Sequence, residues 1–200
     1  MISNSSFLGE LPDFSLKING PVSSKIVARN IHRFHGAINF VNNIAYGRNS
    51  SKLNLTTVID ESKGTCSTKH ALIKTLLDEH EVNSIHLMMG IYRMNEENTP
   101  GIGPILSQHG LEYLPEAHNY LKYRDKRYDY TFPGPKNPII FEQLLEEIII
   151  VPQQIAKFKV DYHQEFLSNW LTTEQLNTTF SLDTIWGIRE ACIQRLSNKN

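Results

Sequence analysis

Cysteine is scarce in this sequence of 200 residues: Cys66 and Cys192 are the only two. Two cysteines are too few for the disulfide frameworks that hold small secreted domains together. We therefore expect two reduced thiols and a cytoplasmic location, where thiols stay reduced. Each thiol then needs an explanation of its own.

Long hydrophobic runs are also missing. The longest aliphatic run covers residues 148–151, far short of the roughly 18 residues that a membrane-spanning helix needs. The first basic residue is Lys17 and no apolar segment stands near the N-terminus, so a signal peptide is not expected. We expect no membrane partner.

No excess of charge of one sign is present. The chain has 20 Lys and Arg against 21 Asp and Glu, a net charge of −1 with neutral histidines. A nucleic-acid-binding protein usually shows a strong basic bias, so no nucleic-acid partner is expected. The 40% hydrophobic content is that of an ordinary globular chain, and the length suits a single domain over residues 1–200.

Apolar spacing predicts helices in the first third of the chain. Residues 23–45 carry one continuous apolar stripe, which is typical of a single amphipathic helix. A second helix is expected over residues 64–79. Residues 84–92 are mostly apolar and predict a central strand, and the Gly- and Pro-containing stretch 95–111 predicts a loop.

The middle of the chain predicts an antiparallel hairpin, with strands at 117–123 and 127–131 and a turn at Asp125-Lys126. After residue 135 the pattern predicts helices only, with Pro152 starting one of them. Phe158, Tyr162 and Phe166 are expected to face inward. The expected fold class is α+β, with a core over 22–135 and a helical C-terminal extension over 136–200.

The segment Gly64-Thr65-Cys66 places a cysteine in the first turn of the second helix. The backbone N–H groups and the positive end of the helix dipole at that position favour thiolate over thiol. Gly64 allows a close backbone approach there. Because the thiolate is the reactive form, Cys66 is the candidate nucleophile.

A nucleophilic cysteine needs a base, and the base needs a group that orients it. The predicted hairpin supplies both, with His118 on its first strand and Asp129 on its second. An imidazole and a carboxylate on adjacent strands can hydrogen-bond across the sheet. Asn119 should point away from His118, so it is not expected to be the orienting group.

These three motifs resemble the transglutaminase-like superfamily, in which Cys, His and Asp form a triad in that chain order. The separations of 52 residues from Cys66 to His118 and 11 residues from His118 to Asp129 suit that family's core. The resemblance covers about residues 60–132. It implies a papain-like core in which the nucleophile helix packs on a small antiparallel sheet, and a catalytic triad of Cys66, His118 and Asp129.

The implied chemistry is acyl transfer through a thioester. Cys66 would attack an amide or ester carbonyl, His118 would protonate the leaving group, and Asp129 would hold the imidazole tautomer. The Cys66 backbone N–H would contribute to the oxyanion hole. The implied substrate is a peptide, a protein or a small amide, no cofactor is required, and the acceptor can be water or an amine.

Three further residues are weaker candidates for substrate binding. Arg48 follows a predicted helix end, where it could hold a carboxylate or simply be solvated. Glu116 and Tyr120 should share a strand face with His118. Glu116 could tune the histidine or face solvent.

Two other functions remain open. The chain could be a non-catalytic binding module of the same fold, or Cys66 could bind a metal together with His70, His118 and Asp129. His70 lies four residues after Cys66 on the same helix face, and its more ordinary role is to pack or hydrogen-bond beneath the site. Cys192 is in register with Ile185 and Ile188, so it is expected in the core.

Overall fold

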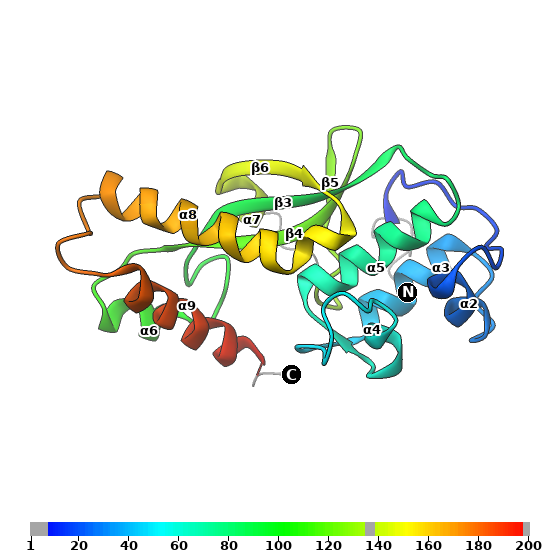
Figure 1. The fold of residues 1–200 in the computed structure, drawn as a ribbon, viewed down its shortest axis with the longest axis horizontal. Helices are drawn as coiled ribbons and strands as arrows, with labels where there is room; N and C mark the ends of the chain where they lie inside the picture. Colours follow the sequence, from blue (N-terminus) through cyan, green and yellow to red (C-terminus); the bar gives the residue numbers. More distant parts are fainter. Residues whose placement is uncertain (1–7, 135–138, 198–200) are drawn as a thin grey trace. The chain divides into compact units, whose positions relative to one another are not determined.

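The computed structural model describes residues 8–134 and 139–197. The fold is α+β, with a four-stranded sheet and helices before and after it (Figure 1), which confirms the α+β part of the predicted fold class. In chain order, the elements are α2 Pro21–Val27, α3 Phe34–Asn43, β1 Ala45–Tyr46, α4 Thr57–Asp60, β2 Lys63–Gly64, α5 Cys66–Asp78, β3 Ile85–Met94, α6 Gly103–Gln108, β4 Leu114–Tyr123, β5 Lys126–Tyr128, α7 Ile139–Glu142, β6 Leu144–Ile150, the 3-10 helix η1 Pro152–Ile155, α8 Lys157–Thr173 and α9 Leu182–Ser197.

Backbone contacts divide the described residues into two compact units. The first unit contains residues 8–88, 119–134 and 149–155. The second contains residues 89–118, 139–148 and 156–197. The division falls within β3, β4 and β6, so it follows the tertiary contacts and not one boundary in the sequence.

Helix α5 is the centre of the first unit. It contacts α2, α3, α4, β2 and η1. Its apolar side chains Leu72, Ile73, Leu76 and Leu77 are at most 2% exposed. Each contributes about 1.5–3 kcal/mol relative to an exposed side chain. The predicted helix over 64–79 is confirmed, and packing of this face fixes its position.

The segment predicted as one helix over residues 23–45 is two helices, α2 and α3. Between them, Asn30 adopts a left-handed conformation with φ 59°, which Asn tolerates better than most residues. The N-terminal arm, which is the described segment before α2, hydrogen-bonds to the chain where the two helices are separated. The Leu16 N–H donates to the His32 carbonyl at 2.9 Å, and the Phe34 N–H donates to the Phe14 carbonyl at 3.0 Å. These backbone bonds to a distant segment interrupt a stripe that is continuous in sequence.

The sheet has the strand order β5-β4-β3-β6. The predicted central strand and antiparallel hairpin are confirmed as β3 and as β4 with β5. Tyr123 pairs with Lys126, so the turn is Arg124-Asp125, one residue earlier than predicted. β5 ends at Tyr128, so Asp129 lies just after the strand and not within it.

The prediction of helices only after residue 135 is wrong for residues 144–150, which form strand β6. The apolar spacing there fits a helix or a strand, and the β-branched run Ile148–Val151 favours a strand. β3 supplies the hydrogen-bonding partner, because β6 is its neighbour in the sheet. The predicted loop 95–111 also contains the short helix α6.

The second unit has its own core, formed by β3, α6, α8 and α9. Leu167, Trp170, Ile185, Ile188 and Cys192 belong to one buried cluster, which confirms Cys192 as a core residue. The inward face of α8 differs from the prediction, because Phe158 is 39% exposed. Its buried residues are Lys159, His163, Leu167, Trp170 and Leu171.

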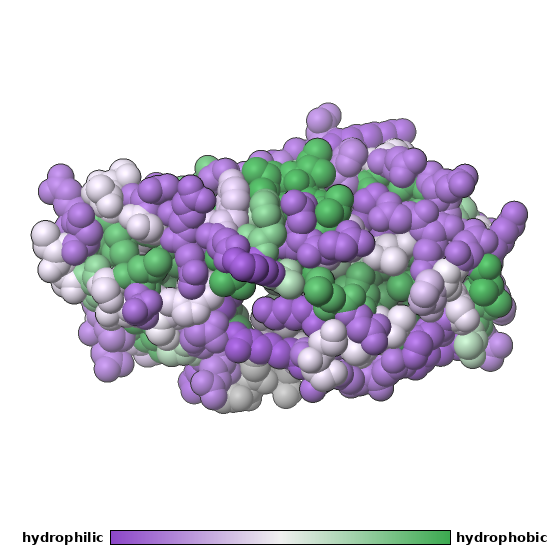
Figure 2. Space-filling model, viewed as in Figure 1, coloured by the Kyte–Doolittle hydropathy of each residue, from purple (hydrophilic) through white to green (hydrophobic). Residues whose placement is uncertain are grey.

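The face in Figure 2 is mostly hydrophilic, and its hydrophobic residues gather in a few patches between the hydrophilic ones. Among the described residues, none of the helices combines the length and the apolar character that crossing a bilayer requires.

Candidate active site

Cys66 is the first residue of α5, as predicted, and it is partly exposed. Thr65 is the N-cap. Its backbone N–H donates to Thr68 Oγ1 at 3.0 Å, and the Thr68 N–H donates to Thr65 Oγ1 at 3.4 Å. This reciprocal capping box starts the helix at Cys66. The thiol therefore lies at the end of the helix where the dipole favours negative charge.

Strand β2 carries the chain into this helix. β2 pairs in parallel with β1, with Tyr46 opposite Gly64. A Cβ atom at Gly64 would lie 2.9 Å from Lys69 Cγ and 3.2 Å from Val58 Cγ1, so no larger residue fits without movement. The predicted close backbone approach at Gly64 is confirmed.

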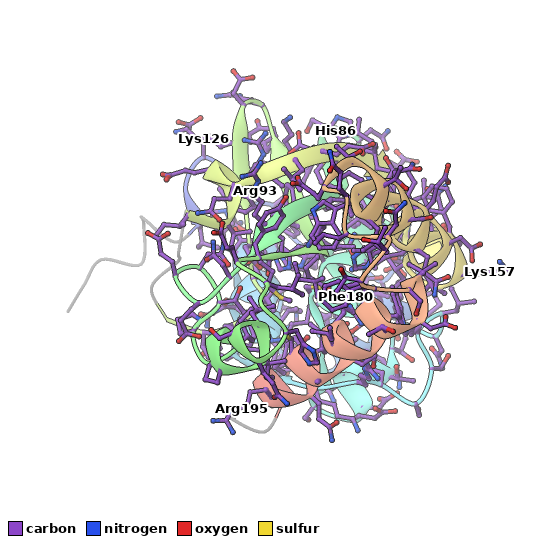
Figure 3. All side chains as sticks on the ribbon, turned by 90° about the vertical axis from the view of Figure 1, so that its left-hand side faces the viewer. His86, Arg93, Lys126, Lys157, Phe180 and Arg195 are labelled. Carbon is purple, nitrogen blue, oxygen red and sulfur yellow. The ribbon has the colours of Figure 1, made fainter. Side chains whose placement is uncertain are left out.

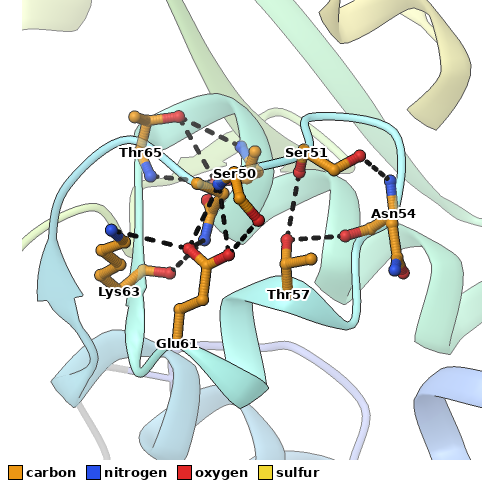
Figure 4. A network of polar contacts seen from close by, with 9 residues as sticks. Ser50, Ser51, Asn54, Thr57, Glu61, Lys63 and Thr65 are labelled. Carbon is orange, nitrogen blue, oxygen red and sulfur yellow. Dashed lines mark hydrogen bonds and ion pairs between the residues drawn. The ribbon is translucent and has the colours of Figure 1, made fainter.

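A polar network ties the loop after β1 to the start of α5 (Figure 4). Asn49 accepts a hydrogen bond from Thr68 Oγ1 at 2.8 Å and donates to the Lys63 carbonyl at 2.8 Å. Glu61 accepts from the backbone N–H and the hydroxyl of Ser50. The hydroxyl of Ser50 is the main cause that lowers the pKa of Glu61. Hydrogen bonds from the loop after β1 therefore stabilise the helical turn that carries Cys66.

Ser67 and Asn119 connect α5 to β4. Ser67 Oγ donates to Asn119 Oδ1 at 2.8 Å, and Asn119 Nδ2 donates to the Met88 carbonyl at 2.9 Å. Cys66 Sγ lies 3.8 Å from Ser67 Oγ. The Asn119 amide is thus used to join the segments, consistent with the prediction that it does not orient His118.

His70 connects α5 to the segment after β5. Its Nδ1 lies 2.7 Å from the Cys66 carbonyl oxygen, and its Nε2 accepts the Tyr130 N–H at 2.8 Å. Asp129 Oδ1 is 3.6 Å from the same Nε2. The structure therefore brings Cys66, His70 and the Asp129 segment together within the first unit. The predicted hydrogen bond of His70 beneath Cys66 is confirmed.

Asp129 and His118 are both placed by the hairpin. Asp129 Oδ1 accepts from the N–H of Thr131 at 2.8 Å and from its hydroxyl at 2.5 Å. His118 lies on β4, is 8% exposed, and belongs to the second unit. Its ring meets the Tyr92 ring edge to face, with centroids 6.1 Å apart.

The three weaker candidates differ in accessibility. Arg48 is exposed, two residues after β1. Tyr120 is fully buried. Glu116, which could have faced solvent, is 5% exposed, and Arg189 donates to both of its carboxylate oxygens at 2.6 and 2.8 Å. Arg48 is therefore the one of the three whose side chain is exposed to solvent.

Glu116 belongs to a buried ion pair of the second unit. Burial by itself would raise its pKa, but Arg189, with help from His163 and Lys159, lowers the pKa to about 2. Burial by itself would lower the pKa of Arg189, but the carboxylates of Glu116 and Glu190 raise it. Burial also raises the pKa of Cys192 to about 11, so this thiol stays protonated at neutral pH.

The metal alternative gains no support from the geometry. Over residues 8–134 and 139–197, no three His, Cys, Asp or Glu side chains converge as ligands. Both ring nitrogens of His70 are already engaged by backbone groups. A metal ion would have to break one of those bonds.

Sequence reasoning missed Lys69 and gave Asn119 no role at the site, although both side chains are fully buried there. Lys69 lies in register with Ile73 and Leu76 on the apolar stripe of α5, and this interruption was the signal that could have revealed it. Its ammonium donates to the Ile44 carbonyl and, at 2.8 Å, to the Thr131 carbonyl.

Comparisons with protein-family models, with curated proteins and with solved structures find no match to this chain. The function must therefore be argued from the residues and contacts described above.

Proposed function

We propose that this chain is a cysteine-dependent amide-bond hydrolase or acyl transferase with a transglutaminase-like, papain-like core. Cys66 is its nucleophile, His118 its base and Asp129 the group that orients the imidazole. Its substrate is a peptide, a protein or a small amide. Its cellular location is the cytoplasm, where the Cys66 thiol stays reduced.

One observation carries the proposal: a hydrogen bond joins α5 to the chain neighbour of the proposed catalytic carboxylate. His70, one turn after Cys66, bonds to Tyr130, the chain neighbour of Asp129. The Cys66 and Asp129 motifs, far apart in sequence, are thus tied to one turn of one helix.

The reaction balances without a cofactor. The Cys66 thiol gives its proton to the His118 imidazole, and the thiolate attacks the carbonyl carbon of the substrate. As the new S–C bond forms, the C–N bond breaks, and the imidazolium returns the proton to the departing amine. The imidazole then takes a proton from water or from an acceptor amine, which attacks the thioester and releases Cys66.

The oxyanion of this step needs hydrogen-bond donors that are already in place. N–H groups in the first turn of a helix have no acceptor within the helix. We assign the Cys66 N–H as one donor, because Cys66 is the first residue of α5. Loss of one such donor typically slows the reaction about 10²–10³-fold.

Alkylation of the native protein by iodoacetamide tests the nucleophile. Read by mass spectrometry from pH 5 to pH 9, Cys66 should react well below the ordinary thiol pKa of about 8.5. Cys192 is the internal control, since burial keeps it protonated. His118→Ala should remove the low-pH reactivity, whereas His86→Ala, which changes an exposed histidine (Figure 3), should leave it unchanged.

A Cys66 that reacts no faster than Cys192 would overturn the proposal. A second readout identifies the acceptor. With p-nitrophenyl acetate as the probe, an acetyl group should appear on Cys66. Release of that group as acetate indicates a hydrolase, and its transfer to added putrescine indicates an acyl transferase.

A further inference from the structure

Two consecutive residues of α5 hold the segment that follows β5. Lys69 donates to the carbonyl of Thr131, and His70 accepts the N–H of Tyr130. Both side chains are fully buried. Because they lie one helical turn after Cys66, they connect the Asp129 segment to the nucleophile's own turn.

The hydrogen bonds of His70 define its tautomer. Nε2 accepts a backbone N–H, so that nitrogen carries no proton. Nδ1 must then carry the proton and donate to the Cys66 carbonyl oxygen. His70 is therefore a neutral imidazole with both nitrogens engaged, so it cannot also serve as the general base for Cys66.

We propose that His70 is a positioning residue, which sets the place of Asp129 relative to Cys66 by bridging the Cys66 carbonyl and the Tyr130 N–H. This inference rests on the proposed function, because it concerns the orientation of a catalytic carboxylate. Lys69 supports the same segment from Thr131.

The bridge acts on the chain next to the carboxylate. Thr131 already supplies two donors to Asp129 Oδ1, so Oδ2 is the oxygen that the proposal assigns to the His118 imidazole. Tyr130 lies between these residues, and a shift of its N–H moves the carboxylate with it. A displacement of 1 Å in such a group can cost about 10²-fold in rate.

The chain offers a matched control in His80. Its Nδ1 lies 2.8 Å from the Leu76 carbonyl oxygen, four residues earlier, and its Nε2 accepts the Lys17 N–H at 2.9 Å. His80 thus makes the same pair of bonds just after the other end of α5. Loss of these bonds should affect folding in both cases, but only His70 adjoins Cys66.

Two substitutions separate the bonds of His70. His70→Asn keeps an amide at the Nδ1 position, where it can donate to the Cys66 carbonyl, and loses the Tyr130 bond. His70→Gln places its amide oxygen near the Nε2 position, where it can accept the Tyr130 N–H. If the bridge positions Asp129, His70→Gln should rescue what His70→Asn loses.

The experiment is the iodoacetamide pH profile of Cys66 in the wild type, His70→Asn, His70→Gln and His80→Asn, with thermal melting to confirm folding. We expect His70→Asn to raise the profile midpoint by about one pH unit, the size of a lost favourable charge interaction. This corresponds to about tenfold slower alkylation at pH 6.5. His70→Gln and His80→Asn should both follow the wild-type profile.

The outcomes are distinguishable. A reactive wild-type Cys66 with an unchanged profile in His70→Asn overturns the positioning role and leaves the proposed function intact. Equal loss in His70→Gln and His70→Asn overturns the role assigned to the Tyr130 bond. A wild-type Cys66 no more reactive than Cys192 overturns the proposed function, and this inference with it.

Discussion

At Gly64, a single hydrogen atom in place of a side chain leaves room for the chain to pass from β2 into α5. The atoms that a Cβ atom would meet belong to Lys69 and Thr68 at the start of α5 and to Val58 of α4. Gly187, within α9, is the opposite case, since nothing lies within 4 Å of its ideal Cβ position. The same substitution should therefore change stability in opposite directions at the two positions.

Gly64→Ala should lower the free energy of unfolding by about 1–3 kcal/mol, because the added methyl group overpacks a filled region. Gly187→Ala should raise it by about 0.5–1 kcal/mol, since Ala is the better helix former and meets no obstacle. Urea denaturation measures both. A neutral Gly64→Ala would show that the neighbouring Lys69 stem can move aside.

At the scale of an element, α5 does more than carry Cys66. Its start is fixed by side chains of the capping box and of the preceding loop, and its middle by Lys69 and His70. Thr68 connects both the cap and the preceding loop. Its hydroxyl accepts the Thr65 N–H at 3.0 Å and donates to Asn49 Oδ1 at 2.8 Å.

Thr68→Val keeps the shape of this buried side chain and removes both hydrogen bonds. We expect a loss of about 2 kcal/mol in unfolding free energy, since each such bond contributes about 1 kcal/mol. Thr68→Ser keeps the hydroxyl and should cost less, about 1 kcal/mol for the lost methyl group. Hydrogen exchange of the α5 amides would show the effect locally, and equal losses in the two variants would contradict it.

At the scale of the whole molecule, each of the two units has its own buried polar connection. In the first, Lys69 and His70 join α5 to the segment after β5. In the second, Glu116 on β4 pairs with Arg189 on α9. A buried pair of this kind is costly to break from one side, because the remaining charge stays without compensation.

Stability should therefore depend on pH through Glu116. Its pKa is about 2 in the folded protein, against an ordinary value of 4.5. Since the unfolded chain binds the proton more readily, the stabilisation is complete above about pH 5 and is lost as pH falls toward 2. This lowering of the pKa corresponds to about 3 kcal/mol of stabilisation.

Glu116→Gln should remove this component, so the difference in unfolding free energy between wild type and variant should shrink by about 3 kcal/mol between pH 6 and pH 2. Glu190→Gln is the matched control. Glu190 also accepts from Arg189, at 2.5 Å, but its side chain is 37% exposed. We expect less than about 1 kcal/mol there, because solvent screens the pair. Equal pH dependence in the two variants would refute the role of burial.

The sequence by itself determined the elements whose signals are local. The capping residues before Cys66, the apolar face of α5 and the alternation around the hairpin each depend on a few neighbouring residues. They fixed α5, β3 and the β4–β5 pair, and placed Cys66 at a helix start. The order of the Cys, His and Asp motifs is likewise a property of the sequence alone.

The tertiary structure decided what depends on distant partners. Residues 144–150 are a strand because β3 offers a hydrogen-bonding edge, and the helix predicted over 23–45 is broken because the N-terminal arm bonds to its middle. The burial of Lys69, Glu116 and Asn119 is stable only because carbonyls, a guanidinium and a hydroxyl from other segments meet them. Periodicity describes one segment at a time, and such partners come from elsewhere in the chain.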